Sequence, residues 1–145
     1  MSRRDISFYV VDIFIAIDKV DRYTNGFTNP QELLHNEMSW DATIRELEII
    51  GEATKHLLKA EIIPKHYRRI VDFRNQINHA YFGIDESIVW DVVTDKLNIY
   101  KNDLKAVVVS ENIYLNDATE KMKTDKFCNN FTLEVLQKLE QLWNE

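Results

Sequence analysis

The residue pattern with the clearest chemical potential in this chain lies between positions 74 and 81. The segment reads Arg-Asn-Gln-Ile-Asn-His-Ala-Tyr and places Arg74, His79 and Tyr81 at fixed spacing inside an expected helix. An arginine stays charged and can bind a phosphate through two parallel hydrogen bonds, whereas a histidine titrates close to neutrality and can transfer protons. Together these side chains form a minimal set for metal-free attack on a phosphodiester.

Positive charge is concentrated around this segment although the protein as a whole is acidic. The net charge of −6 argues against a general nucleic-acid coat protein, because basic surface supplies most non-specific affinity. Between positions 65 and 79, Lys65, Arg68, Arg69 and Arg74 stand against Asp72 alone, so 4 − 1 gives a local charge of +3. Lys65, Arg68 and Arg69 are therefore candidate RNA-binding residues, and a merely solvated helix face is the competing interpretation.

Length and composition predict one soluble domain without metal or cofactor. A chain of 145 residues can bury its own core. The single cysteine, Cys128, excludes an internal disulfide and a cysteine-based zinc site, and no two histidines are four residues apart. We find no signal peptide and no run approaching the roughly 18 apolar residues of a spanning helix. A cytoplasmic protein with no membrane contact is therefore expected.

Apolar residues at helical spacing predict an all-α protein. Only three glycines and two prolines occur, too few for the turns of a sandwich or barrel. Short connections favour an up-down four-helix bundle over residues 1–110, followed by a C-terminal extension over residues 111–145 with an additional amphipathic helix. The expected helices span residues 4–23, 39–60, 65–82, 85–109 and 129–143, with a short helical turn inside residues 27–38.

Three residues of the second expected helix carry specific predictions. Ser39 is its predicted N-cap. Gly51 costs a helix about 1 kcal/mol relative to alanine, which indicates close approach of another helix backbone. Glu52 is interpreted as a structural residue that could orient Arg74.

The helix expected over residues 65–82 has apolar residues on two faces. At about 100° per residue, Asn75 and His79 lie opposite the inner stripe, with Val71 and Phe82 beside them. Such an outer face suits a second subunit, and a two-fold axis would let Arg74 and His79 of both copies share one groove. The inner stripe consists of Ile70, Phe73, Ile77, Ala80 and Ile84. For the C-terminal helix, the predicted inner residues are Phe131, Val135, Leu139 and Leu142.

The order Arg74-x4-His79-x-Tyr81 resembles the signature of HEPN-domain proteins, specifically the HepT-type ribonuclease toxins of the HepT/MntA toxin–antitoxin family. In these systems the toxin is paired with a minimal nucleotidyltransferase antitoxin. The resemblance covers about residues 4–109, and further matching segments follow in sequence order at residues 23–26, 45–53, 72–75 and 81–85. Residues 64–67 depart from the family, since Pro-Lys-His-Tyr stands where Pro-x-Trp is common.

The resemblance implies a dimeric four-helix bundle that acts as the toxin of a type VII toxin–antitoxin system. It implies a metal-independent endoribonuclease in which the ribose 2′-hydroxyl attacks the adjacent phosphorus. His79 would act as general acid or base, and Arg74 would hold the scissile phosphate. Asn75 would position one of them or cap the dimer groove. Tyr81 matches the tyrosine to which the antitoxin transfers AMP, which would block the RNA groove.

Purely structural roles remain open for several of these residues. Arg74 could pair with Glu48 or Glu52 on the neighbouring helix, and Tyr81 could be an ordinary half-buried tyrosine. A different class of function is also compatible with the chain, namely a non-catalytic HEPN module that binds a nucleotidyltransferase partner or a nucleotide. The remaining histidines, His35, His56 and His66, are interpreted as structural.

Overall fold

The computed structural model describes residues 2–79 and 83–142, except for the side chains of residues 78 and 79. Within these ranges every regular element is helical, which confirms the predicted all-α class. The elements are α1 (Arg3–Thr24), α2 (Pro30–His35), α3 (Glu37–Lys59), η1 (Lys65–Tyr67), α4 (Arg68–His79), α5 (Glu86–Asp91), η3 (Val92–Lys96), α6 (Leu97–Ser110), α7 (Asn116–Lys123) and α8 (Asn130–Glu140).

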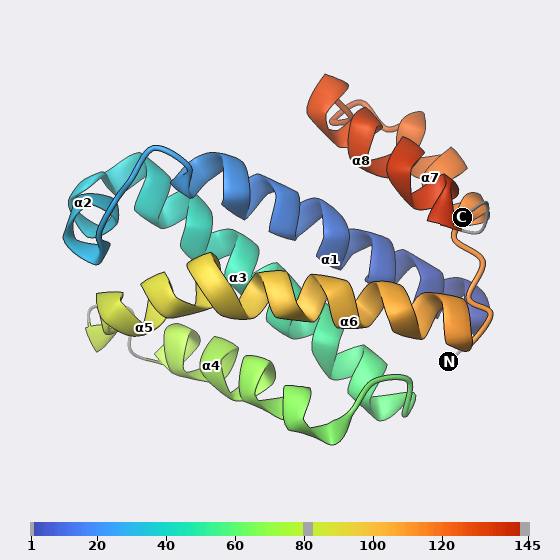
Figure 1. Ribbon diagram of the computed structural model, residues 1–145, viewed down its shortest axis with the longest axis horizontal. Helices are drawn as coiled ribbons and strands as arrows, with labels where there is room; N and C mark the ends of the chain where they lie inside the picture. The colour runs from blue at the N-terminus through green and yellow to red at the C-terminus, as the bar shows by residue number, and fades with distance from the viewer. Residues whose placement is uncertain (1, 80–82, 143–145) are drawn as a thin grey trace.

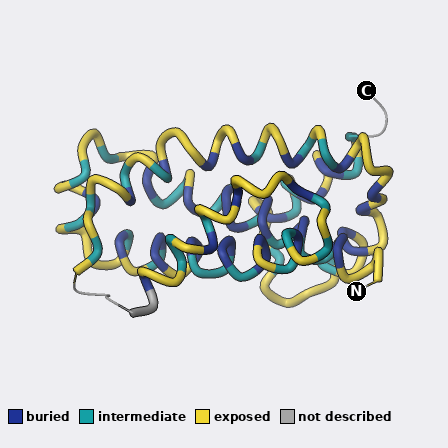
Figure 2. The backbone as a smooth tube through the Cα atoms, turned by 90° about the horizontal axis from the view of Figure 1, so that it is seen from below, coloured by how far each residue is buried: buried dark blue, intermediate teal, exposed yellow. Residues whose placement is uncertain are grey.

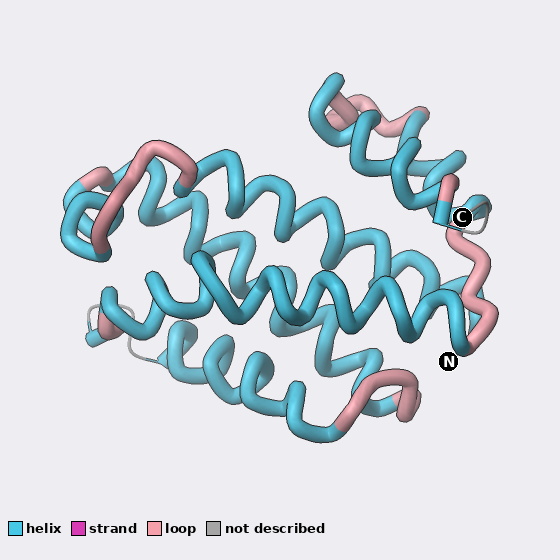
Figure 3. Tube along the Cα trace, viewed as in Figure 1, coloured by secondary structure: helices cyan, strands magenta, loops and turns pink. Residues whose placement is uncertain are grey.

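Four long helical segments form the predicted up-down bundle. α1 packs along α3, α3 packs on α4, and the continuous α5–η3–α6 segment returns against α1 (Figure 1). Short loops join α1 to α2 and α3 to η1, and α2 packs against α3 and α5 at one end of the bundle (Figure 3). This order makes α3 the central neighbour of both α1 and α4.

The core follows the helical spacing of the apolar residues. In Figure 2 the buried parts of the helices face one another and the exposed parts face outward. α3 contributes Leu47, Ile50 and Leu57, all nearly or fully buried, to this core. The buried hydroxyl of Tyr100 on α6 bonds the Thr54 hydroxyl of α3 at 2.9 Å, so that neither polar group is left unsatisfied. α3 is thus fixed in rotation, and with it the face that α3 presents to α4.

The fourth helical segment differs from the single regular helix predicted over residues 85–109. Asp85 caps its start by accepting the Ser87 N–H at 2.8 Å. Residues 92–96 form one wider π-helical turn between α5 and α6. Val89, Val93 and Leu97 nevertheless all face the core.

The N-cap predicted at Ser39 was wrong. Asn36 caps α3, with its side-chain oxygen accepting the Ser39 N–H at 3.1 Å. Asparagine is among the strongest N-caps, and Asn36 has the extended backbone that a cap requires. Because Asn36 precedes Ser39, the helix begins earlier than predicted and Ser39 lies within its first turn.

The C-terminal extension contains two helices where one was predicted. α7 lies in the polar stretch after Ser110, and with α8 it packs against α1 on the side of the bundle away from α4 (Figure 1). Leu115, Ala118, Leu136 and Leu139 are buried there. Phe131 was predicted to face inward, but it is 56% exposed and lies under the Arg22 guanidinium at 4.4 Å, a cation–π contact.

Candidate active site and nucleic-acid interface

α4 carries the candidate chemistry and is positioned by its inner face. Ile77 is fully buried, and Ile70 and Phe73 pack partly buried against the core, as predicted. Val71 was predicted on an outer face toward a second subunit, but it is buried within the single chain. The reason is that α3 continues to Lys59 and covers this side of α4.

The closest approach of α3 and α4 occurs where Gly51 faces Arg74. A Cβ at position 51 would lie 2.3 Å from the Arg74 Cβ and 2.6 Å from its Cγ, far inside ordinary carbon contact. Glycine at position 51 therefore lets the arginine stem lie directly against the α3 backbone. The close approach predicted from Gly51 is confirmed.

The Arg74 guanidinium is held by two oxygen acceptors. Nη2 lies 3.1 Å from the Glu52 Oε2, and Nη1 donates to the Asn75 Oδ1 at 3.2 Å. Nε is buried and has no hydrogen-bond partner among the described residues. The arginine side chain as a whole is 27% exposed, so part of the group can still reach solvent or a ligand.

The carboxylate of Glu52 also contacts His56. Nε2 of His56 lies 3.4 Å from the Glu52 Oε1, and the His56 ring stacks on Tyr9 of α1 with ring centroids 4.2 Å apart and planes 8° apart. Because Glu52 is 44% exposed, its ion pair with Arg74 adds no more than about 1 kcal/mol to stability. The contacts matter more for geometry, since they link α1 and α3 to the arginine.

The structure describes the other site residues predicted near Arg74 to different extents. Asn75 is exposed beside Arg74, where it accepts the arginine's hydrogen bond. His79 is the last residue of α4, about 7.5 Å beyond Arg74 along the helix axis, and its side chain lies outside the described residues. Tyr81 also lies outside them, as do Ala80 and Phe82.

The structure separates the three predicted RNA-binding residues. Arg68 lines a groove between α3 and α4, Arg69 lies on the opposite side of α4 near Lys96, and Lys65 is exposed in η1. We call the groove between α3 and α4 the basic groove. It has a volume of about 400 Å³ and is lined by Lys55, Leu58, Lys59, Arg68, Val71, Arg74 and Asn75.

Two neighbours of Arg74, Lys55 and Lys59, were not predicted from the sequence. They lie four residues apart on α3, on the face that begins with Glu52. The signal that could have found them was Gly51, which marks where α3 meets α4 and hence which α3 side chains flank Arg74.

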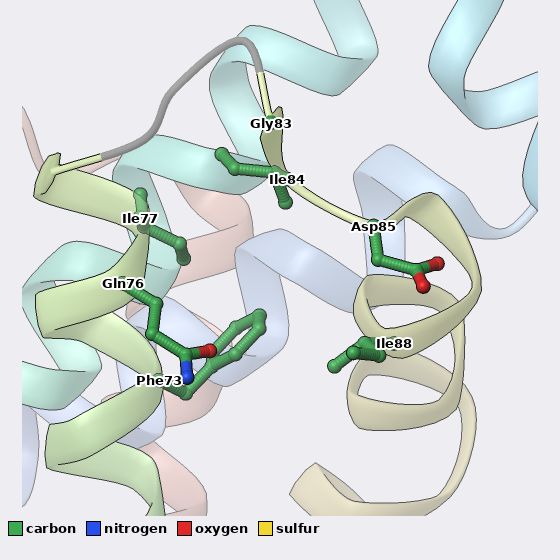
Figure 4. A pocket seen from close by; sticks show the side chains of 7 residues that line it. All are labelled: Phe73, Gln76, Ile77, Gly83, Ile84, Asp85 and Ile88. Carbon is green, nitrogen blue, oxygen red and sulfur yellow. The ribbon is translucent and has the colours of Figure 1, made fainter.

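A second pocket lies on the other side of α4. Phe73, Gln76 and Ile77 of α4 face Ile84, Asp85 and Ile88 across a space of about 210 Å³ (Figure 4). The Phe73 ring points toward α5 in this view. Its lining is mostly apolar, and among the described residues its one charged member is the acidic Asp85, which would repel a phosphate.

A further groove, here the C-terminal groove, separates α1 from the C-terminal extension. Its volume is about 210 Å³, and burial raises the pKa of Asp12 at its base to about 6. The lining residues are Asp12, Ile15, Lys19, Met122, Asp125, Phe127, Cys128 and Thr132.

The described part of the chain offers neither a metal cluster nor a membrane span. Its His, Cys, Asp and Glu side chains form no group of three that could hold a metal ion. Among the same residues, no helix combines the length and apolar character needed to cross a bilayer.

Comparison with known proteins identifies the family. Residues 13–107 match the family described as HepT-like, ribonuclease HepT-like. The chain belongs to the HepT-like ribonuclease family. This result confirms the resemblance to this family found in the sequence. No solved structure matches the chain.

Individual relatives agree with this family. A Methanocaldococcus jannaschii protein named as a candidate RNase is 31% identical over 110 residues, covering 74% of this chain and all of the relative. The "Probable ribonuclease HepT" of Thermococcus cleftensis is 32% identical over 101 residues, covering 66% and 88%. A second M. jannaschii protein, named as a γ-glutamylcyclotransferase and candidate RNase, is 28% identical over 145 residues, covering 97% of this chain and 60% of the relative.

Proposed function

We propose that this HepT-like protein is a metal-independent endoribonuclease and the toxin of a type VII toxin–antitoxin system in the cytoplasm. The observation that carries the proposal is Arg74, seated against Gly51 and held by Glu52, five residues before His79 in a chain of this family. An arginine fixed in this way can stabilise charge that develops on a phosphate without reorganising first.

The proposed reaction uses two groups of the chain. The ribose 2′-hydroxyl loses its proton and attacks the adjacent phosphorus, the P–O5′ bond breaks, and the leaving 5′-oxygen takes up a proton. His79 serves as the general acid or base for one of these transfers, and Arg74 neutralises the charge on the phosphoryl oxygens. Asn75 supports Arg74 through their hydrogen bond. In the proposed homodimer, both copies of α4 contribute to one composite site.

RNA cleavage in the presence of EDTA tests this proposal. The purified protein should cut single-stranded RNA with chelator present and leave 2′,3′-cyclic phosphate and 5′-hydroxyl ends. His79→Ala and Arg74→Ala should each abolish cleavage, because one removes the proton-transfer group and the other the phosphate ligand. Thermal melting of both variants shows whether the fold is kept. Cleavage that persists in both folded variants, or that stops with EDTA, contradicts the assignment.

We further propose that a minimal nucleotidyltransferase antitoxin silences the enzyme by transferring AMP to Tyr81. The added phosphate lies two residues from His79 and would repel the RNA backbone. Mass spectrometry of protein co-expressed with such a partner should find AMP on Tyr81. An inactive complex with an unmodified chain would argue for inhibition by steric cover instead.

A second candidate function is favoured by the ion pair between Arg74 and Glu52. An arginine already neutralised by its own chain could be purely structural, and the protein would then be a non-catalytic HEPN module that binds a nucleotidyltransferase or a nucleotide. Expression without a partner separates the two functions. Growth arrest that disappears with His79→Ala supports the ribonuclease, and normal growth supports the binding module.

A further inference from the structure

The basic groove gathers positive charge that the fold itself does not require. Four of its lining residues are cationic and none is acidic, in a protein with a net charge of −6. Arg74 has Glu52 as a partner, but Lys55, Lys59 and Arg68 form no ion pair within the described part of the chain. Like charges brought together repel one another, so their grouping is unfavourable until an anion enters.

Several other cations of the protein are paired on their own helix or with a neighbour. Arg22 contacts Asp18 at 3.0 Å, Lys138 contacts Glu134 at 3.3 Å, and Lys123 contacts Glu140 at 2.5 Å. Such pairs are the ordinary arrangement on a helical surface. Other exposed cations, such as Arg45 and Lys121, also lack an ion pair within the described part of the chain, so the basic groove is distinguished by having four cations and no carboxylate in its lining.

The cations of the basic groove are spread along both helices, and the candidate catalytic Arg74 is the last of them on α4. Lys55 and Lys59 lie about 6 Å apart along α3, and Arg68 and Arg74 lie about 9 Å apart along α4. The cations therefore follow a path instead of surrounding one point. A path of this kind fits a chain of phosphates better than a single small anion.

The floor of the groove is aliphatic, formed by Leu58 and Val71. Val71 is buried and Leu58 is half-buried, so the cationic side chains stand around an apolar base. Sugar and base surfaces of a single strand can rest on such a floor while the rim holds the phosphates.

We propose that the basic groove binds the RNA backbone next to the scissile phosphate, with Lys55 and Lys59 of α3 and Arg68 of α4 as phosphate ligands. The proposal rests on the proposed ribonuclease function and adds α3 to its substrate-binding surface. Arg74 then occupies the junction between two parts of the site, with the groove on one side and His79 on the other.

RNA binding measured without cleavage tests the groove. Fluorescence anisotropy of a labelled single-stranded RNA is recorded in the His79→Ala background over a range of salt concentrations. Lys55→Ala, Lys59→Ala and Arg68→Ala are combined in one variant. Losing three phosphate contacts should reduce the slope of log K against log salt by about 2, since each contact contributes about 0.7 for single strands. Affinity should fall about tenfold or more at about 0.1 M salt.

A matched variant removes three positive charges outside the groove. Arg45→Ala, Lys121→Ala and Lys126→Ala change the net charge equally, and all three residues are exposed and lie outside the lining of the groove. This variant should keep the salt slope and lose little affinity. Equal losses in both variants would show that net charge alone governs binding and would overturn the groove. An unchanged slope in the groove variant would overturn it as well.

The same measurements separate this proposal from the ribonuclease itself. If the wild type cleaves RNA but binding does not depend on the groove cations, the groove proposal is wrong and the ribonuclease proposal stands. If binding depends on the groove cations but the wild type cleaves no RNA, the groove proposal stands and the ribonuclease proposal is wrong. Labelled ATP that binds through these three cations more tightly than RNA would overturn the proposal in favour of a nucleotide site.

Discussion

The two grooves that flank the bundle differ in the charge of the side chains that line them. The basic groove between α3 and α4 has cations on both walls and no carboxylate. The C-terminal groove between α1 and the C-terminal extension has Asp12 and Asp125 against Lys19 alone. Both have apolar residues in their lining, and the basic groove is the larger, at about 400 Å³ against about 210 Å³. The difference shows that the bundle segment α3–α4 carries the features a polyanion needs, whereas the C-terminal groove would repel one.

Among substitutions that compare the two grooves, the largest effect should come from the glycine that brings the two walls of the basic groove together. Gly51→Ala places a Cβ 2.3 Å from the Arg74 Cβ, so α4 must shift by more than about 1 Å to restore ordinary contact. A misplacement of this size can cost about 100-fold in rate. We expect kcat/KM for RNA cleavage to fall by about that factor.

Gly26→Ala is the matched control, since a Cβ at that position would meet no atom within 4 Å beyond its chain neighbours. It should cleave RNA like the wild type. If Gly51→Ala retained full activity with a normal melting temperature, the contact between Gly51 and Arg74 would have no part in the site.

A smaller effect is expected from the carboxylate that holds Arg74. Glu52→Gln keeps a hydrogen-bond acceptor but removes the charge. The exposed pair is worth up to about 1 kcal/mol, which corresponds to a loss of kcat/KM of at most about fivefold. Stability should barely change. Steady-state kinetics with Glu48→Gln as the control decide the point, and a faster Glu52→Gln enzyme would mean that the carboxylate competes with phosphate for the arginine.

The prediction with the smallest effect on function concerns the C-terminal groove. Burial raises the pKa of Asp12 from its ordinary value of 3.8 to about 6. The folded state therefore holds the proton more tightly, so this group's contribution to stability is full below pH 3.8 and is lost as the pH rises through about 6. Asp12→Asn should stabilise the protein by about 1 kcal/mol near pH 7.5, after discounting for solvent screening. The gain should vanish below pH 3.8.

Denaturant unfolding of Asp12→Asn at the two pH values checks this sign. Asp125→Asn is the control in the same groove, because an asparagine oxygen can still accept the Phe127 N–H bond seen at 2.8 Å. Neither substitution should alter RNA binding. Stronger RNA binding by Asp12→Asn would break the distinction between the two grooves.

Much of the bundle could be predicted because each helix is encoded by residues that are close together in the sequence. Periodic apolar residues predicted the long helices of the bundle, and Gly51 indicated the close contact with another helix. α7 was missed because its sequence is polar and only Ala118 and Thr119 are buried, a pattern too short to show a periodicity. Val71 was assigned to the outside because its cover, the C-terminal end of α3, comes from a distant part of the sequence.

The site residues on α4 could be predicted from the sequence, whereas those on α3 could not. Arg74, Asn75 and His79 share one short segment, so their spacing is visible in the sequence. Lys55 and Lys59 reach Arg74 only through the packing of two helices, and Arg68 and Arg69 separate only once the rotation of α4 is fixed. Proximity in the sequence correctly placed Arg68, Arg69 and Arg74 on one helix, but not on one face, and Lys65 lies in η1.

The contacts that Arg74 makes in the free protein have a consequence for selectivity. Two of its five N–H groups already donate to Glu52 and Asn75, so an incoming anion meets the remaining N–H groups of a guanidinium whose charge Glu52 partly neutralises. A mononucleotide or inorganic phosphate would therefore gain little from this arginine alone. A polymer binds several cations of the protein at once, so its affinity depends less on any one of them. The arginine therefore favours long substrates over the abundant small phosphates of a cell.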